Sequence, residues 1–333
     1  MTTAEPILSV RNLRKWFPVR RGIFSSLFQE QQYVKAVDDV SFDVAKGSSI
    51  AIAGESGCGK TTLARTILRL THPTDGAVYY EGQNIFEMNR IELSEMRLRM
   101  QLIFQNPFEV LDPRHTVEDL VGEGLVIHQI EESDEVLHDR VIKALEDVRL
   151  IPAEQFATRY IHELSGGQLQ RIAIARSLIL NPNLIIADEP VSMLDASIRT
   201  EVMNLMTDLQ KEKDLTYIFI THDLAQARYV GEYLIIMYLG KIAEMGPMEE
   251  VIQNPQHPYT KALVSNIPIP DPTEKRERIM LPGETPTPID LPPGCRFKDR
   301  CQEFGPQCKP EEPELVEVAP NHFVACYLKY AAQ

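Results

Sequence analysis

The stretch that decides the fold is GESGCGKTT, residues 54–62, which consists of Gly54, Glu55, Ser56, Gly57, Cys58, Gly59, Lys60, Thr61 and Thr62. It matches the phosphate-binding pattern G-x-x-x-x-G-K-[ST]. In this pattern the glycines let backbone N–H groups surround phosphates, the lysine reaches the β and γ oxygens, and the hydroxyl that follows ligates Mg²⁺. The predicted helix after the loop points its positive end at the phosphates. We therefore predict that residues 54–62 bind a nucleotide.

The segments around this loop predict alternating strands and helices. Short β-favouring runs at 7–17 and 40–55, separated by a polar stretch, indicate strands of one sheet. Apolar spacing predicts a helix over 61–70, and a helical insertion over 116–163. The remaining predicted elements are a helix at 167–180, an apolar strand at 184–188, a helix at 196–212 and a strand at 216–222. Fully apolar strands that alternate with helices predict a parallel sheet covered on both faces.

A pair of carboxylates, Asp188 and Glu189, closes the apolar strand LIIAD. One carboxylate can hold the Mg²⁺ shell while the next faces the γ-phosphate and orients a water for attack. A charged pair after a strand is otherwise often a solvated turn. Together with the phosphate-binding loop it predicts Asp188 as a metal ligand and Glu189 as the catalytic residue.

A second glycine-rich turn, LSGGQ, contains Ser165, Gly166, Gly167 and Gln168 at the start of a predicted helix. Ser165 can cap this helix, and the glycines leave N–H groups open to an anion. LSGGQ followed by a helix and then by the DE pair resembles the signature of ABC ATPases. The resemblance implies an α/β fold with a P-loop NTPase core, an antiparallel β subdomain and a helical insertion.

The family resemblance implies roles for three further residues. Gln105 in IFQNP matches the Q-loop glutamine, which contacts Mg²⁺ and the γ-phosphate region. Asp195 in SMLD matches the D-loop aspartate, and His222 in ITHD matches the switch histidine. Without the resemblance, Gln105 would be an ordinary surface amide and His222 a structural histidine at a strand end.

The resemblance also implies an aromatic residue under the adenine ring, near the end of the first strand. Stacking needs only a flat π face. Phe17 matches best by spacing, while Trp16 and Tyr33 remain alternatives, and any of the three could belong to the core.

Three longer stretches narrow the resemblance to the ATPase subunits of oligopeptide and dipeptide ABC importers. They are RYIHELSGGQLQRIAIARSL at 159–178, NPQHPYTKALVSNIP at 254–268 and LPPGC at 291–295, and the likeness extends from Ile7 to about Leu328. Met193 departs from the family, where a small residue is commoner, but leaves Asp195 in register. The implied activity is ATP hydrolysis coupled to peptide import; related systems move nickel, oligosaccharides or other small solutes.

The C-terminal part of the chain holds four of the five cysteines, at Cys295, Cys301, Cys308 and Cys326. Their spacing resembles the segment that holds a [4Fe-4S] cluster in this importer family. Zn²⁺ also suits four thiolates, although the close C-x₂-C pairs of usual zinc modules are missing. Disulfides are disfavoured in a reducing cytoplasm. The fifth cysteine, Cys58, lies in the phosphate-binding loop and is excluded as a ligand.

Composition sets the remaining expectations. The chain has 333 residues, 44% hydrophobic and 25% charged, and is proline-rich from about residue 265. We expect a nucleotide-binding domain over 1–265, with a helical subdomain at about 106–163. A proline-rich linker and a four-cysteine extension would follow over 266–333. No stretch is long and apolar enough to span a bilayer, and no signal peptide is recognisable, so we expect the chain in the cytoplasm.

The expected partners follow from the resemblance. LSGGQ of one ABC subunit caps the ATP of another, which implies a second ATPase subunit, identical or related. Two membrane permeases and an extracellular solute-binding protein would place this chain on the cytoplasmic face of the membrane. A net charge of −14 disfavours nucleic acid as a partner. The alternative is a soluble ABC ATPase of nucleic-acid repair or translation, but such proteins carry two ATPase units or a long coiled coil. An exporter subunit would commonly be fused to membrane helices.

Overall fold

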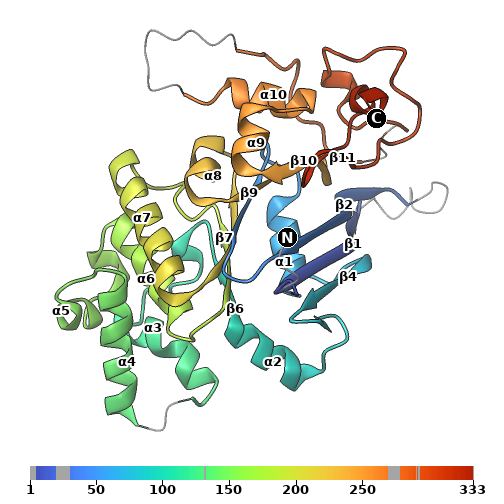
Figure 1. Ribbon diagram of the computed structural model, residues 1–333. Helices are drawn as coiled ribbons and strands as arrows, with labels where there is room; N and C mark the ends of the chain where they lie inside the picture. Colours follow the sequence, from blue (N-terminus) through green and yellow to red (C-terminus); the bar gives the residue numbers. More distant parts are fainter. Residues whose placement is uncertain are drawn as a thin grey trace, which may run out of the picture. The chain divides into compact units, whose positions relative to one another are not determined.

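The computed structural model describes residues 5–19, 31–130, 133–268, 278–289, 291 and 293–332 (Figure 1). The chain forms two compact units. The first comprises residues 1–45, 49–87 and 220–333, and the second comprises residues 46–48 and 88–219. Strand β8 (Thr216–Thr221) is fully buried and crosses from the second unit to the first along the chain.

The first unit contains two sheets and the helices that cover them. Its described elements are β1 (Leu8–Pro18), β2 (Tyr33–Val44), β3 (Ser49–Ala53), α1 (Lys60–Ile67), β4 (Asp75–Tyr80), β5 (Gln83–Asn84), α8 (Leu224–Val230), β9 (Tyr233–Tyr238), β10 (Lys241–Pro247), α9 (Met248–Gln253), α10 (Pro258–Ser265), β11 (Val316–Ala319) and β12 (His322–Val324).

An antiparallel sheet has the strand order β2-β1-β4-β5. The expectation that residues 7–17 and 40–55 belong to one sheet is therefore wrong in part. The chain turns at Gly47, whose φ is +72°, and residues 49–53 form β3 in the other sheet. All five residues of β3 are buried, whereas β2 alternates between buried and exposed positions, so the two runs suit different environments.

The second sheet of this unit has the order β11-β12-β10-β9-β3. Strands β3 and β9 are parallel, while β9, β10, β12 and β11 pair antiparallel. Helices α8, α9 and α10 bury Leu224, Val251 and Tyr259 in a core shared with β3 and β9. Phe297 of the C-terminal segment completes that core.

The second unit is mainly helical. Its elements are α2 (Arg90–Arg99), β6 (Met100–Ile103), α3 (Val117–Ile127), α4 (Asp134–Asp147), α5 (Ala153–Ala157), α6 (Gly166–Leu178), β7 (Leu184–Asp188) and α7 (Ala196–Lys213). Strands β6 and β7 are parallel, which agrees with the predicted parallel sheet, although no strand was predicted at residues 100–103. Helices α3, α4 and α5 fall within the predicted helical range, and Val117, Leu120 and Val121 of α3 are buried.

The C-terminal segment, residues 278–332 as described, packs within the first unit. Strand β12 pairs with β10, and the ring of Phe297 meets that of Tyr238 edge-on at 5.2 Å between centroids. The predicted proline-rich linker falls partly on residues 269–277, 290 and 292, which lie outside the described residues. Among the helices that the structure describes, none has the length and apolar character needed to cross a bilayer.

Candidate functional site

The predicted phosphate-binding loop connects the buried strand β3 to helix α1 in the first unit. Gly59 stands just before α1 with φ +108°, and a Cβ on it would lie 1.9 Å from the carbonyl oxygen of Ala36. A side chain is therefore excluded there. Helix α1 has no side-chain cap and no acidic residue in its first turn. Its first N–H groups thus face the loop without a competing carboxylate, which suits a phosphate.

The side chain of Lys60 is folded back onto the loop. It is 5% exposed, and its Nζ donates to the carbonyl oxygens of Gly54 at 2.7 Å and Glu55 at 3.1 Å. The buried thiol of Cys58 lies 3.7 Å from Nζ, and burial raises the pKa of this thiol despite the nearby ammonium. Cys58 is therefore a neutral packing residue. The ammonium can exchange these carbonyl contacts for phosphate oxygens.

Two predicted residues of the second unit meet. Gln105 follows β6 and donates from Nε2 to Oε2 of Glu189 at 3.0 Å. Glu189 follows β7 in a left-handed conformation, with φ 48°, whereas Asp188 is 7% exposed at the end of the strand. The turn directs the two neighbouring carboxylates into different surroundings, as their separate predicted roles require. The sequence placed both residues in the site but did not predict their hydrogen bond.

The predicted cap of the second glycine-rich turn is confirmed. Ser165 Oγ accepts from the backbone N–H of Gln168, and Gln168 Oε1 accepts from the backbone N–H of Ser165 at 2.9 Å. This capping box begins α6 and leaves Ser165 and Gly166 exposed. Gly167 lies against α7, since a Cβ on it would come 2.4 Å from Ile198 Cγ2. The turn is therefore fixed by its cap and by packing against α7, while Ser165 and Gly166 remain accessible.

Asp195 and His222 are both exposed. Asp195 precedes α7 without capping it through its side chain, and its carbonyl accepts from Arg199 N at 2.8 Å. His222 follows β8 in the first unit, just before Asp223, which caps α8. Both residues thus stand at the ends of elements, in backbone positions that neighbouring hydrogen bonds define.

The three aromatic candidates for adenine stacking differ in accessibility. Phe17 and Tyr33 are each 39% exposed. Trp16 donates its indole N–H to Asp38 at 3.0 Å, and the ammonium of Lys35 lies 4.8 Å from the centre of its ring. The ammonium of Lys15 lies equally close to the Phe17 ring, at 4.8 Å. Phe17 and Tyr33 are therefore the more open surfaces only because Trp16 is half-buried and its indole N–H is already bonded.

The three predicted Mg²⁺ ligands belong to different units of the chain. Thr61 belongs to the first unit, and Gln105 and Asp188 belong to the second. In the part of the chain that the structure describes, no three His, Cys, Asp or Glu side chains are grouped to hold a metal ion. This finding gives no support to a cluster at the four C-terminal cysteines.

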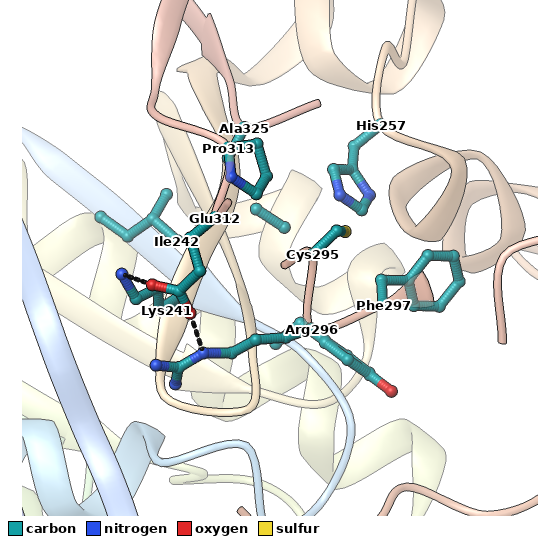
Figure 2. A pocket seen from close by; sticks show the side chains of 11 residues that line it. Lys241, Ile242, His257, Cys295, Arg296, Phe297, Glu312, Pro313 and Ala325 are labelled. Atoms are coloured by element: carbon teal, nitrogen blue, oxygen red, sulfur yellow. Dashed lines mark hydrogen bonds and ion pairs between the residues drawn. The ribbon is translucent and has the colours of Figure 1, made fainter. Parts of the chain in front are cut away.

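Two of the four C-terminal cysteines pack against the core of the first unit. Cys295 and Cys301 lie against the apolar core around Phe297. Figure 2 shows Cys295 beside His257 and Phe297 at the wall of a pocket. The pocket has a volume of about 40 Å³, too small for a nucleotide or a peptide.

Residues 37–192 match the family model "ABC transporter", and residues 243–308 match "Oligopeptide/dipeptide transporter, C-terminal region". The chain is 47% identical over 333 residues to "Oligopeptide transport ATP-binding protein AppF" of Bacillus subtilis, covering 98% of this chain and 99% of that protein. It is 42% identical over 322 residues to "Dipeptide transport ATP-binding protein DppF" of Haemophilus influenzae, covering 97% and 96%.

The chain belongs to the ATP-binding proteins of oligopeptide and dipeptide ABC transporters. Solved structures agree on the ABC cassette fold. The ATP-binding cassette MJ0796 in a dimeric state bound to ADP and Pi gives a TM-score of 0.63 at 30% identity, covering 72% of this chain and 98% of that one. The structure of cbiO1 from Clostridium perfringens gives 0.63 at 26% identity, covering 75% and 92%. The family resemblance stated from the motifs is confirmed.

Within this ABC transporter ATP-binding protein, the C-terminal family region includes Cys295, Cys301 and Cys308, and Cys326 lies beyond it. The same region contains Tyr259 and Arg300, which contact the phosphate-binding loop and were not predicted. The hydroxyl of Tyr259 accepts from the backbone N–H of Glu55 at 2.8 Å. No local sequence pattern marks either residue, because each lies more than 200 positions from the loop.

Proposed function

We propose that this protein binds Mg-ATP at residues 54–62 and hydrolyses it to drive the import of oligopeptides, dipeptides or a related small solute. The observation that carries the proposal is likeness over almost the whole chain, C-terminal region included, to peptide-transport ATP-binding proteins. The uncapped helix α1 and the buried Lys60 support the nucleotide site.

The roles proposed for the motif residues support the following hydrolytic step. Glu189 orients the attacking water, and Gln105 holds the carboxylate through its amide N–H. Lys60 stabilises the charge that develops on the transferred phosphoryl group. Thr61, Gln105 and Asp188 would hold a Mg²⁺ ion, which would supply further positive charge to the phosphates. His222 and Asp195 complete the γ-phosphate region.

The remaining partners follow from the same family. The exposed Ser165–Gln168 turn of a second ATPase subunit, identical or related, would cover the ATP held here. Phe17, or Tyr33 in its place, would support the adenine ring. Residues 106–163 would transmit closure and opening of the pair to two permease subunits. The protein would thus be peripheral on the cytoplasmic face of the membrane, with a solute-binding protein outside.

Co-expression with the permeases tests this assignment. We expect the protein to co-purify with membrane subunits and peptide-loaded binding protein to stimulate ATP hydrolysis in reconstituted vesicles. Co-purification with ribosomes or DNA instead would favour the soluble alternative, a repair or translation ATPase. A panel of dipeptides, longer peptides, nickel and oligosaccharides in the same assay identifies the solute.

A [4Fe-4S] cluster at the four C-terminal cysteines is the remaining part of the proposal, with Zn²⁺ as the alternative. All four are free thiols, and burial together with charge on the other three raises the pKa of Cys326 to about 11. As placed, the thiols form no ligand group, so no step of hydrolysis is derived through a cluster. Anaerobic purification followed by metal analysis and visible absorption spectroscopy tests this proposal. Iron and sulfide in the protein would support the cluster, whereas one zinc ion per chain would contradict it.

A further inference from the structure

An arginine of the C-terminal segment forms an ion pair with the phosphate-binding loop. Arg300 ends the 3₁₀ helix Lys298–Arg300 and is 7% exposed. Its Nη1 donates to Glu55 Oε2 at 2.6 Å and its Nη2 to Glu55 Oε1 at 3.2 Å. Thr285 donates its hydroxyl to the same carboxylate. This two-pronged geometry is specific to a guanidinium, because an ammonium lacks the planar fork.

Arg300 is itself held in place. Its Nε donates to the carbonyl oxygen of Pro282 at 3.1 Å, and its guanidinium carbon lies 5.9 Å from the centre of the Tyr238 ring. The hydrogen bonds to Glu55 raise the pKa of Arg300. Burial alone would raise the pKa of Glu55, but hydrogen bonds from Arg300 and Thr285 outweigh it and lower that pKa. Glu55 is therefore an anion at neutral pH.

A second arginine anchors the same segment next to the loop. Arg296 donates to Asp38 and to the carbonyl of Leu239, and its Nε donates to Glu312 at 2.8 Å. Figure 2 shows Glu312 between Arg296 and Lys241. Asp38 N donates to the carbonyl of Gly240, and Gly240 N donates to the carbonyl of Cys58 at 2.8 Å. The C-terminal segment thus contacts the loop directly at Glu55, and Arg296 is linked to Cys58 only indirectly, through Asp38 and Gly240.

Because Glu55 is charged, its contact with Arg300 affects how the loop would bind a nucleotide. Its backbone belongs to the loop that would surround the phosphates, and its carbonyl accepts from Lys60 at 3.1 Å. An uncompensated carboxylate beside a polyphosphate is repulsive, and the repulsion is strong where water is partly excluded. Arg300 removes that repulsion and also fixes the loop through the side chain.

We propose that Arg300 is a positioning residue of the ATP site, through which the C-terminal segment sets the affinity for ATP by neutralising and holding Glu55. Arg300 touches Glu55 and not the reacting atoms. The inference rests on the proposed function, since it presumes that residues 54–62 bind ATP.

Equilibrium binding of a fluorescent ATP analogue with Mg²⁺, at fixed ionic strength, tests the inference on the full-length protein. We expect Arg300→Gln to raise the Kd about tenfold, the factor that corresponds to ~1.4 kcal/mol. Arg300→Lys should fall between wild type and Arg300→Gln, because it keeps the charge and loses the fork. Lys298→Gln, two residues away on the same short helix and bonded only within the segment, is the matched control and should bind as wild type.

A rescue experiment separates positioning from a merely structural effect. Glu55→Gln combined with Arg300→Gln removes the unpaired carboxylate, so the double variant should bind the analogue more tightly than Arg300→Gln alone. In the transport complex, Arg300→Gln should raise KM for ATP and change kcat much less. Thermal midpoints of all variants show whether they are folded, and if Arg300→Gln does not fold, Arg300→Lys with and without Glu55→Gln makes the same comparison.

The outcomes are distinct. Wild-type binding of the analogue by folded Arg300→Gln overturns the inference, and so does a double variant that is no better than the single one. If the wild-type protein itself fails to bind, the proposed ATP site fails instead.

Discussion

The backbone conformation of Glu189 determines where its carboxylate points. Its φ of 48° is uncommon for a residue with a side chain and costs energy. Ser192 stabilises the turn by donating its backbone N–H and its hydroxyl to the Glu189 carbonyl oxygen, at 3.2 and 3.0 Å. The carboxylate thereby turns away from the buried strand and reaches Gln105. A residue in this position can face a water.

The first prediction concerns this carboxylate. Glu189→Gln keeps the shape and the ability to accept a hydrogen bond but removes the charge that orients and deprotonates water. We expect phosphate release to fall by about 100-fold or more, with ATP affinity unchanged. Glu212→Gln, an exposed glutamate near the end of α7, should leave both quantities unchanged. Normal turnover by Glu189→Gln would contradict its assignment as the catalytic residue.

At the scale of elements, the junction of α6 and α7 depends on one of two adjacent glycines. A Cβ on Gly167 would lie 2.4 Å from Ile198 Cγ2, whereas a Cβ on Gly166 would lie 3.6 Å from the nearest atom, on Leu194. The first distance requires the β-branched Ile198 to move, and the second is an ordinary contact. The two glycines are therefore not equivalent for stability.

We predict that Gly167→Ala lowers the free energy of unfolding by about 1–3 kcal/mol, the usual cost of overpacking. Gly166→Ala is the matched control and should be neutral or slightly stabilising, because alanine favours a helix. Urea unfolding followed by circular dichroism measures both. Equal urea midpoints for the two variants would show that α7 accommodates the extra methyl group with no loss of stability.

A feature can be predicted from the sequence when the residues that cause it lie close together in the chain. The loop at 54–62, the cap at Ser165 and the strand that ends at Asp188 each rest on a few neighbouring residues, and the structure has all three elements. The placement of β3 depended on a partner strand 183 positions further on, at Tyr233, and was missed. The contact of Arg300 with Glu55 spans 245 positions and had no local signal.

At the scale of the whole molecule, stability should depend on pH through a buried histidine. His257 is 3% exposed, and its Nδ1 accepts from Tyr259 N at 3.0 Å at the start of α10. Burial lowers the pKa of His257 to about 4, although Glu244 and Glu303 oppose that shift; Lys261 adds to it. Because the unfolded chain binds this proton more readily, stability falls as pH drops from about 6.5 towards 4, by at most ~1.4 kcal/mol per pH unit.

We expect His257→Asn to flatten this dependence, since asparagine also caps a helix and does not titrate. Thermal midpoints of the wild type and the variant should converge between pH 6.5 and pH 4, even if the variant is less stable at neutral pH. His72→Asn, an exposed histidine of the same unit, should follow the wild-type slope. Parallel curves for His257→Asn and wild type would assign the acid sensitivity to other groups.

The pairing of β12 with β10 has a consequence for biosynthesis. Until the ribosome has delivered residues 322–324, the outer edge of β10 lacks the partner that it has in the finished protein. An open strand edge is a template for association with other chains. Until then, buried Glu244 on β10 also lacks its contact with His322. In the finished protein, Nε2 of His322 lies 2.7 Å from the carboxylate of Glu244. We therefore expect a chain that ends before residue 322 to associate with other chains and to be cleaved by proteases more readily than the full-length protein.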